Sequence, residues 1–134
     1  MSGRFVLAGN TERETLNWGT LGWMSRPATT GAGQLVVIEV NLLPGRGHNF
    51  HKHPDQEEVI YVLEGEVEQW LEAENRSLHP GDAVFIGAGV VHASFNSAAA
   101  PARLLAILGP CVGDGGYVSV EMGEQEPWRS LRSS

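Results

Sequence analysis

Cysteine is nearly absent from this chain, which has only Cys111 among its 134 residues. A single thiol excludes an intramolecular disulfide, so the fold cannot depend on one. Because 42% of the residues are hydrophobic, the chain can instead bury a core of ordinary size. We expect Cys111 to be a small apolar packing residue, because the sequence places no base beside it that would make it a nucleophile.

Long apolar runs and basic clusters are also lacking. No stretch approaches the roughly 20 residues of a transmembrane helix, and the N-terminus lacks the apolar core of a signal peptide. We therefore expect a cytoplasmic protein that does not bind membranes. The formal charge is −7. Nucleic acids and anionic lipid surfaces favour basic patches, so neither is expected as a partner.

The sequence shows no amphipathic helix of normal length and no internal repeat. Its 17 glycines and 7 prolines are spread along the chain and mark turns. Between them lie short segments rich in β-branched and aromatic residues, which favour strands. The segments that we expect to be strands or strand-like are 4–8, 15–25, 34–43, 58–63, 66–73, 83–86, 90–95, 102–108 and 117–120. This pattern predicts an all-β barrel or sandwich.

Turns and loops are expected between these segments, at 27–33, 64–65, 75–76 and 79–82. Segment 102–108 is also compatible with a helical turn, but its length and its flanking prolines favour a buried strand. The tail 124–134 is expected to form one helical turn begun by Pro127, or else to be a frayed end.

Strand 66–73 has two different faces. We expect its inner face to carry Gln69, as a core amide or as part of a ligand pocket. The remaining inner residues are Val67, Leu71 and Ala73. Trp70 falls on the opposite face, together with Glu66, Glu68 and Glu72. Since half of the acidic residues lie in 55–74, we interpret that region as a solvated sheet face.

The segment 45–65 contains the strongest chemical signal. His51 and His53 are two positions apart, so on an extended strand both side chains point to the same face. Glu58 follows after a turn at Pro54. Two imidazoles and a carboxylate directed at one point are ligands of first-row transition metals.

Glu57 competes with Glu58 for the role of carboxylate ligand. Glu58 lies an odd number of positions after the second histidine, so one continuous strand would turn it away. The intervening proline interrupts the strand and allows the facing to be reset. Glu58 then shares its face with Ile60 and Val62, and we expect it to be the ligand.

A second glycine-framed segment, GDAVFIGAGVVHASFN at 81–96, supplies His92 and Asn96. The two segments resemble the paired motifs of the cupin superfamily, which are a glycine, an HxH pair, a glutamate and a glycine, then a glycine, a PxG turn, a histidine and an asparagine. The first motif matches throughout. The second departs at Gly87, where the family usually has proline, and we expect this change to loosen the turn without removing a ligand.

The resemblance implies a cupin-type double-stranded β-helix, or jelly-roll barrel. We expect a single cupin domain over 1–134, with its barrel core at about 34–109 and extensions at both ends. The compact cupins also imply a homodimer, and exposed edge strands give a physical reason for such pairing.

The expected ligand set for one divalent transition-metal ion is His51, His53, Glu58 and His92. The sequence does not choose among Fe, Mn, Ni, Cu, Co and Zn. Four ligands on an octahedral ion leave two positions open for substrate, water or dioxygen, as at a catalytic site. We expect Asn96 to support the backbone, and His48 to lie no closer than the mouth of the site.

Two functions compete at this point. The first is a metal-dependent enzyme, oxygenase-like or an isomerase, whose small organic substrate binds the open positions. The second is a non-catalytic cupin that binds or senses a small molecule, although no DNA-binding segment accompanies it. No general acid or base can be assigned, and Glu57 and Gln69 are only candidates.

Overall fold

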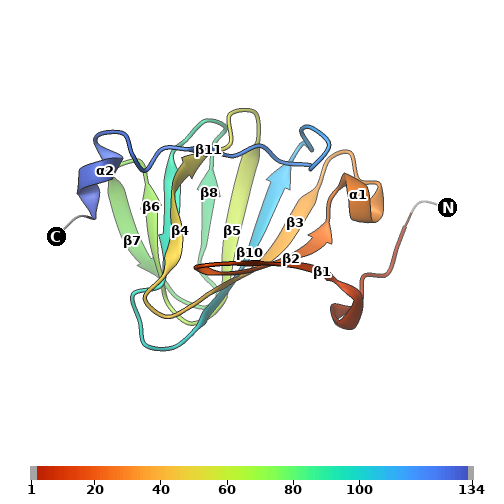
Figure 1. Ribbon diagram of the computed structural model, residues 1–134, viewed down its shortest axis with the longest axis horizontal. Helices are drawn as coiled ribbons and strands as arrows, with labels where there is room; N and C mark the ends of the chain where they lie inside the picture. Colours follow the sequence, from red (N-terminus) through yellow and green to blue (C-terminus); the bar gives the residue numbers. More distant parts are fainter. Residues whose placement is uncertain (1–2, 133–134) are drawn as a thin grey trace.

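Two antiparallel β-sheets face each other in the computed structural model, which describes residues 3–132 (Figure 1). The six-stranded sheet, in the order β1-β2-β3-β10-β5-β8, is formed by β1 (Glu12–Leu16), β2 (Gly19–Ser25), β3 (Val36–Leu42), β5 (Glu57–Glu64), β8 (Ala83–Ile86) and β10 (Ala102–Gly109). The five-stranded sheet, in the order β11-β4-β9-β6-β7, is formed by β4 (Gly47–Lys52), β6 (Val67–Leu71), β7 (Glu74–Leu78), β9 (His92–Phe95) and β11 (Val120–Glu121). The helical turns are η1 (Ala8–Asn10), α1 (Pro27–Thr30) and α2 (Trp128–Leu131). Within the described residues, no helix is long and apolar enough to cross a membrane.

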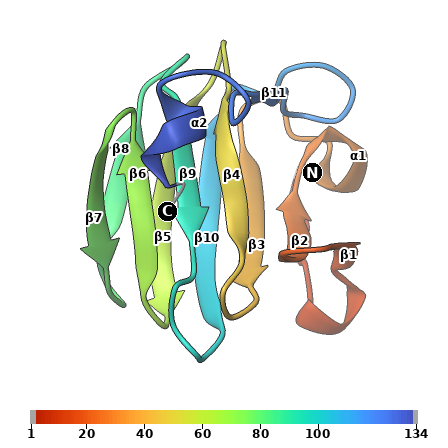
Figure 2. The same ribbon diagram turned by 60° about the vertical axis from the view of Figure 1, so that its left-hand side comes forward.

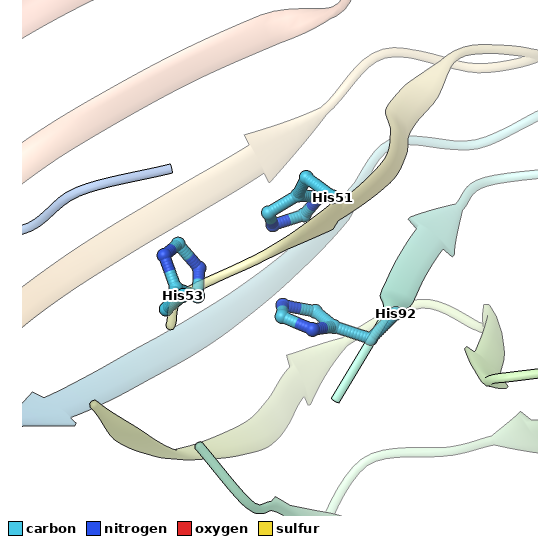
Figure 3. Close-up of side chains that lie close together, drawn as sticks. All are labelled: His51, His53 and His92. Atoms are coloured by element: carbon cyan, nitrogen blue, oxygen red, sulfur yellow. The ribbon is translucent and has the colours of Figure 1, made fainter. Parts of the chain in front are cut away.

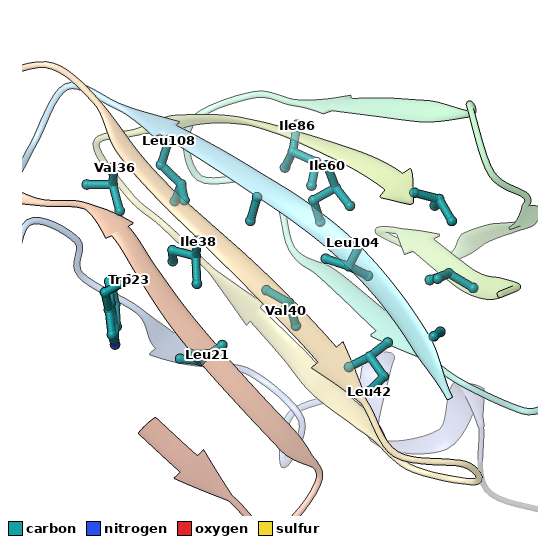
Figure 4. Close-up of a cluster of buried hydrophobic side chains, with 14 residues drawn as sticks. Leu21, Trp23, Val36, Ile38, Val40, Leu42, Ile60, Ile86, Leu104 and Leu108 are labelled. Carbon is teal, nitrogen blue, oxygen red and sulfur yellow. The ribbon is translucent and has the colours of Figure 1, made fainter. Parts of the chain in front are cut away.

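The main core lies on the inner face of the six-stranded sheet (Figure 4). Strands β3 and β10 pair along their whole length, and buried residues alternate with more exposed ones in both. This period of two is what a strand with one buried face requires. The central core residues are Val36, Ile38, Val40, Leu42, Ile60, Leu104, Ala106 and Leu108. The facing sheets confirm the expected all-β double-stranded β-helix.

A second apolar cluster lies on the outer face of the five-stranded sheet. Its buried members are Phe50, Trp70, Val91, Ala93, Phe95 and Met122. Helix α2 lies in front of β6 and β9 (Figure 2), and its Trp128 and Leu131 pack on this cluster. The expected solvated face of 66–73 is therefore wrong for Trp70, which is 6% exposed because the C-terminal tail covers it. The helical turn expected after Pro127 is confirmed.

The N-terminal part differs from the prediction at three places. Residues 4–8 form no strand, and Phe5 is 98% exposed with no neighbouring strand to pair with. Segment 15–25 contains the turn and second strand of the β1–β2 hairpin. The loop expected at 27–33 begins with α1, since Pro27 is suited to a first helical position and Gly31, with φ of 75°, ends the turn.

Two further elements are also displaced from their expected positions. The turn expected at 75–76 lies earlier, because Asn75 and Arg76 pair with β6 inside β7. Glu72 in that turn has φ of 52°, a left-handed conformation without the glycine that would mark it in the sequence. The strand expected at 117–120 shrinks to β11. The remaining strands agree within two residues, and the helical alternative for 102–108 is wrong.

Candidate metal centre

Three buried histidines converge inside the barrel (Figure 3). His51 on β4 lies opposite His92 on β9 in the strand pairing, and His53 follows directly after β4. One ring nitrogen from each lies within 4.8 Å of the others. Their exposed fractions are only 4%, 3% and 1% for His51, His53 and His92. The structure thus brings together residues from both sequence motifs.

Each of these imidazoles is oriented by a backbone carbonyl. The Nδ1 contacts are His51 to Asn49 O at 2.7 Å, His53 to Val118 O at 2.9 Å and His92 to Val90 O at 3.0 Å. A carbonyl can only accept, so Nδ1 must donate, and in the neutral ring Nε2 is left as the free acceptor. This arrangement fixes the tautomer and ring orientation that metal-binding histidines require.

Glu58 completes the cluster from the opposite sheet. Its Oε1 lies 3.0 Å from Nε2 of His92 and 3.4 Å from Nε2 of His53. Oε1 of Glu58 and Nε2 of His92 are both buried without a hydrogen-bond partner among the described residues. Two buried acceptors that face each other at this distance repel unless a proton or a metal ion lies between them. The donor set therefore fits a divalent transition-metal ion. Glu57, the rival carboxylate, points to the exposed face of β5.

The electrostatic environment of His51 and His53 disfavours their protonated forms. Burial lowers the pKa of His51 well below its usual value, and the neighbouring His48 and His92 act in the same direction. Burial also lowers the pKa of His53, although Glu58 and the Val118 carbonyl partly oppose the shift. Neutral imidazole is the form that binds metals, so these shifts favour the binding-competent state of His51 and His53.

A β-bulge brings His48 onto the same face as the cluster. His48 pairs with Ser94 and His51 with His92, so β4 has one more residue than β9 between these pairs. The ring of His48 stacks on His51 with centroids 3.7 Å apart and on Trp18 at 4.8 Å. Strand parity alone would place His48 and His51 on opposite faces, so the sequence, which put His48 no closer than the mouth, did not predict this stacking.

The C-terminal extension also contributes to the site, which the sequence did not indicate. Besides the Val118 carbonyl, Tyr117 lies against His53 with ring centroids 5.3 Å apart. Burial raises the pKa of Tyr117, and the carboxylates of Glu14, Glu58 and Glu121 add to this shift. The sequence predicts a short strand at 117–120, but no pattern in it indicates that this segment reaches the histidines, because that contact depends on the folded path of the chain.

The remaining predicted residues have supporting positions. Gln69 is a buried amide that accepts from the Ser94 hydroxyl at 2.6 Å and donates to the Trp70 carbonyl. It lines a separate cavity and not the one beside the histidines. Asn96 donates to the carbonyls of Leu42 and Ala100, and thus supports the backbone. In the glycine turn that contains Gly87, the backbone N–H of Gly89 donates to the backbone carbonyl of His53 at 2.9 Å.

A small cavity of about 40 Å³ adjoins the cluster. It is lined on one side by His48, His51, Glu58, His92, Ser94 and Tyr117, and on the other by Leu21, Ile38, Val40, Leu42, Ile60, Leu104, Ala106 and Leu108. The structure therefore defines a β-barrel whose ligand-type side chains open onto a mainly aliphatic chamber.

Comparison with protein families agrees with this class. The model of the cupin domain matches residues 28–108, more than half of the chain. The chain therefore belongs to the cupin family, which confirms the resemblance seen in its motifs.

Individual relatives are more distant. The tetracenomycin polyketide synthase protein TcmJ of Streptomyces glaucescens is 27% identical over 84 residues, which are 63% of this chain and 56% of that protein. The chain thus spans little more than half the length of this relative. KdgF from Halomonas sp. has a TM-score of 0.71 and 19% identity, with coverage of 80% of this chain and 94% of the other. Oxalate decarboxylase of Lactobacillus farciminis has a TM-score of 0.75 and 17% identity, with coverage of 87% and 35%. At these identities the two structures show a common fold.

Proposed function

We propose that this cupin is a metal-dependent, oxygenase-like enzyme that acts on a small organic molecule. His51, His53, Glu58 and His92 would hold one divalent transition-metal ion. The observation that carries the metal site is the pair of buried atoms Oε1 of Glu58 and Nε2 of His92, which lie 3.0 Å apart and have no hydrogen-bond partner within residues 3–132. A buried acceptor pair of this kind is costly unless a cation joins it.

The protein side chains have separable roles in this proposal. The three imidazoles and the carboxylate would hold the ion, and His51, Glu58 and His92 also line the cavity. When bound, the ion supplies a Lewis acid for substrate oxygens and, if it is redox-active, electrons for dioxygen. The aliphatic wall from β3 and β10 excludes water from the reacting groups. Tyr117 and His48 border the cavity as protic side chains outside the ligand set.

Two open positions suit a substrate that offers two adjacent oxygens, such as a diketone, an enediol or a catechol-like compound. The similarity to a polyketide synthase protein supports this class, because polyketide chains carry 1,3-related carbonyl groups. An enolised dicarbonyl of this kind would place both oxygens on one side of the ion.

Metal content and oxygen uptake test the proposal together. Protein purified without an affinity metal column should contain close to one equivalent of a transition metal by elemental analysis. After anaerobic loading with Fe(II), it should consume oxygen with a member of a diketone, enediol and catechol panel. Absence of oxygen uptake with every metal and substrate would overturn the oxygenase assignment.

A non-catalytic binding function is the second candidate. It is supported by the cavity lining, in which aliphatic side chains outnumber protic ones and no carboxylate other than Glu58 is present. Under this alternative, a ligand would raise the melting temperature of the metal-loaded protein, and no product would form.

We also propose that the protein forms a homodimer through the outer face of the six-stranded sheet. Val59 and Phe85 lie opposite each other on β5 and β8, and both are exposed, at 36% and 59%. Strand β8 ends this sheet, so its edge is available to a second copy. Light scattering should give a dimer mass, and Phe85→Asp should shift it to the monomer. The cytoplasmic location expected from the sequence stays a prediction.

A further inference from the structure

The chamber beside the histidines is too small to hold a whole substrate. Its volume of about 40 Å³ leaves room for a few water molecules or for one chelating group, since a single water needs roughly 10–15 Å³. A larger groove of about 490 Å³ lies outside it. Leu21, His48 and Tyr117 line both spaces, so the groove adjoins the chamber. The body of any ligand that reaches the metal must therefore occupy this groove.

Flat rings run from the groove to the metal-binding residues. Trp18 in the groove stacks on His48 with an interplanar angle of 12°, and His48 stacks on His51 with an angle of 15°. Tyr117 forms another part of the lining. Aromatic surfaces of this kind favour planar, ring-bearing ligands, which bury apolar area against them and stack.

The side chains that line the groove carry charge of one sign, and the guanidinium of Arg46 reaches its wall only through the backbone carbonyl of Asn17, at 3.2 Å. Glu14 and Glu121 line it, and no lysine or arginine is found among its lining residues. The guanidinium of Arg26 is engaged elsewhere, because it pairs with Glu12 and lies 4.0 Å from the centre of the Trp23 ring. Fixed negative charges around a cleft repel anions and attract cations. A groove built for a carboxylate or phosphate would present cations instead.

We infer that the ligand of this site is a planar, ring-bearing chelator without negative charge, and that Trp18, Glu14 and Glu121 select it. This inference rests on the proposed function, because it assumes a metal held by the four buried side chains. It adds the chemical class: a neutral or cationic ring compound with two adjacent oxygens.

Three catechols with the same chelating end but different charges test whether the groove selects against anions. They are added to the Zn(II)-loaded protein, because zinc has no redox chemistry that would consume them. The compounds are 4-ethylcatechol, dopamine and 3,4-dihydroxyphenylacetate, which are neutral, cationic and anionic. Calorimetry at low ionic strength should show the anion binding about fivefold to tenfold more weakly than the neutral compound. Dopamine should bind at least as tightly as 4-ethylcatechol. The differences should shrink at about 1 M salt, where the Debye length is roughly 3 Å.

Substitutions assign the selectivity to the groove. Glu14→Gln combined with Glu121→Gln should bring the three affinities close together. The matched control is Glu66→Gln combined with Glu74→Gln, which removes two exposed charges outside the groove and should leave the discrimination unchanged. Equal discrimination in both double variants would overturn the role of the groove carboxylates.

Trp18 is tested with a chelator that has no ring. Trp18→Ala should weaken 4-ethylcatechol severalfold and leave acetohydroxamic acid, a neutral chelator without a ring, unchanged; Trp18→Phe should restore most of the catechol affinity. An equal loss for both compounds would overturn the stacking role.

The zinc content of every sample distinguishes a failure of this inference from a failure of the proposed function. Protein with one equivalent of zinc that binds the anion as tightly as the neutral catechol, or binds no catechol, would overturn this inference alone. Protein that retains no zinc would overturn the proposed function as well.

Discussion

The inner faces of the two sheets of the barrel differ in polarity. The buried residues on the inner face of the six-stranded sheet are apolar apart from Glu58, whereas those of the five-stranded sheet include His51, His92, Ser94 and Gln69 beside the apolar Val67. The five-stranded sheet can present polar groups inward because it is anchored on its outer side, where the C-terminal tail covers a second apolar cluster. Stability and chemistry are thus assigned largely to different sheets, and substitutions should separate them.

The largest effect is expected from removing a histidine of the five-stranded sheet, whose inner face is polar (the polar sheet); the six-stranded sheet is the apolar sheet. His92→Ala should abolish stoichiometric metal binding, since one of four donors is lost, while the barrel still folds because the apolar sheet is intact. Elemental analysis after dialysis and far-UV circular dichroism measure the two properties. His79→Ala, which removes an exposed histidine in a turn, is the control. Full metal occupancy in the His92 variant would exclude His92 as a ligand.

The converse substitution is on the apolar sheet. Leu104→Ala should lower the free energy of unfolding by about 2–5 kcal/mol, because a fully buried leucine leaves a cavity. The metal stoichiometry of the folded fraction should stay unchanged. Leu105→Ala, on the other face of the same strand and only partly buried, should cost much less. Urea titrations compare the two, and similar losses would contradict a core confined to the inner face.

The difference between the two sheets also explains which parts of the structure could be predicted from the sequence. β-Branched residues identified β3, and length and flanking prolines identified β10 as a strand. The faces of β5 were readable after the proline turn, and they favoured Glu58 over Glu57. Trp70 was misjudged because its cover comes from a tail about 50–60 positions later, and no local pattern shows that contact. His48 was missed as a neighbour of His51 because a bulge reverses strand parity, and a bulge without glycine leaves no signal in the sequence.

A smaller effect is expected from acid on the metal-free protein. Burial lowers the pKa of His51 and His53, so the folded state resists protonation that the unfolded chain accepts near pH 6.5. The unfolded state then binds more protons, and the free energy of unfolding must fall as the pH drops below about 6.5, until the folded histidines also titrate. The melting temperature should therefore decrease from about pH 7.5 to pH 5.5.

Two comparisons check the origin of this pH dependence. His79→Gln should leave the slope unchanged, since that side chain is exposed. Saturating zinc should raise the melting temperature throughout, because only the folded site binds the ion. A melting temperature that does not change with pH in the metal-free protein would contradict the buried, neutral state of the histidines.

The smallest effect on stability is expected at the contacts of Arg132, which hold the C-terminal tail on the polar sheet and which we call the clamp. The guanidinium of Arg132 lies 3.7 Å from the centre of the Phe95 ring and donates to Glu68 at 2.7 Å. Partial burial would raise the pKa of Glu68, but hydrogen bonds from Arg132, Trp70 and Ser97 outweigh it and lower the pKa to about 2. Both contacts are near solvent, so Arg132→Ala should cost only about 0.5–1 kcal/mol of unfolding free energy. Arg129→Ala, on α2 itself and without an ion-pair partner among the described residues, should cost less. Equal effects of the two substitutions would mean that apolar packing of Trp128 and Leu131 holds the tail without help from the clamp.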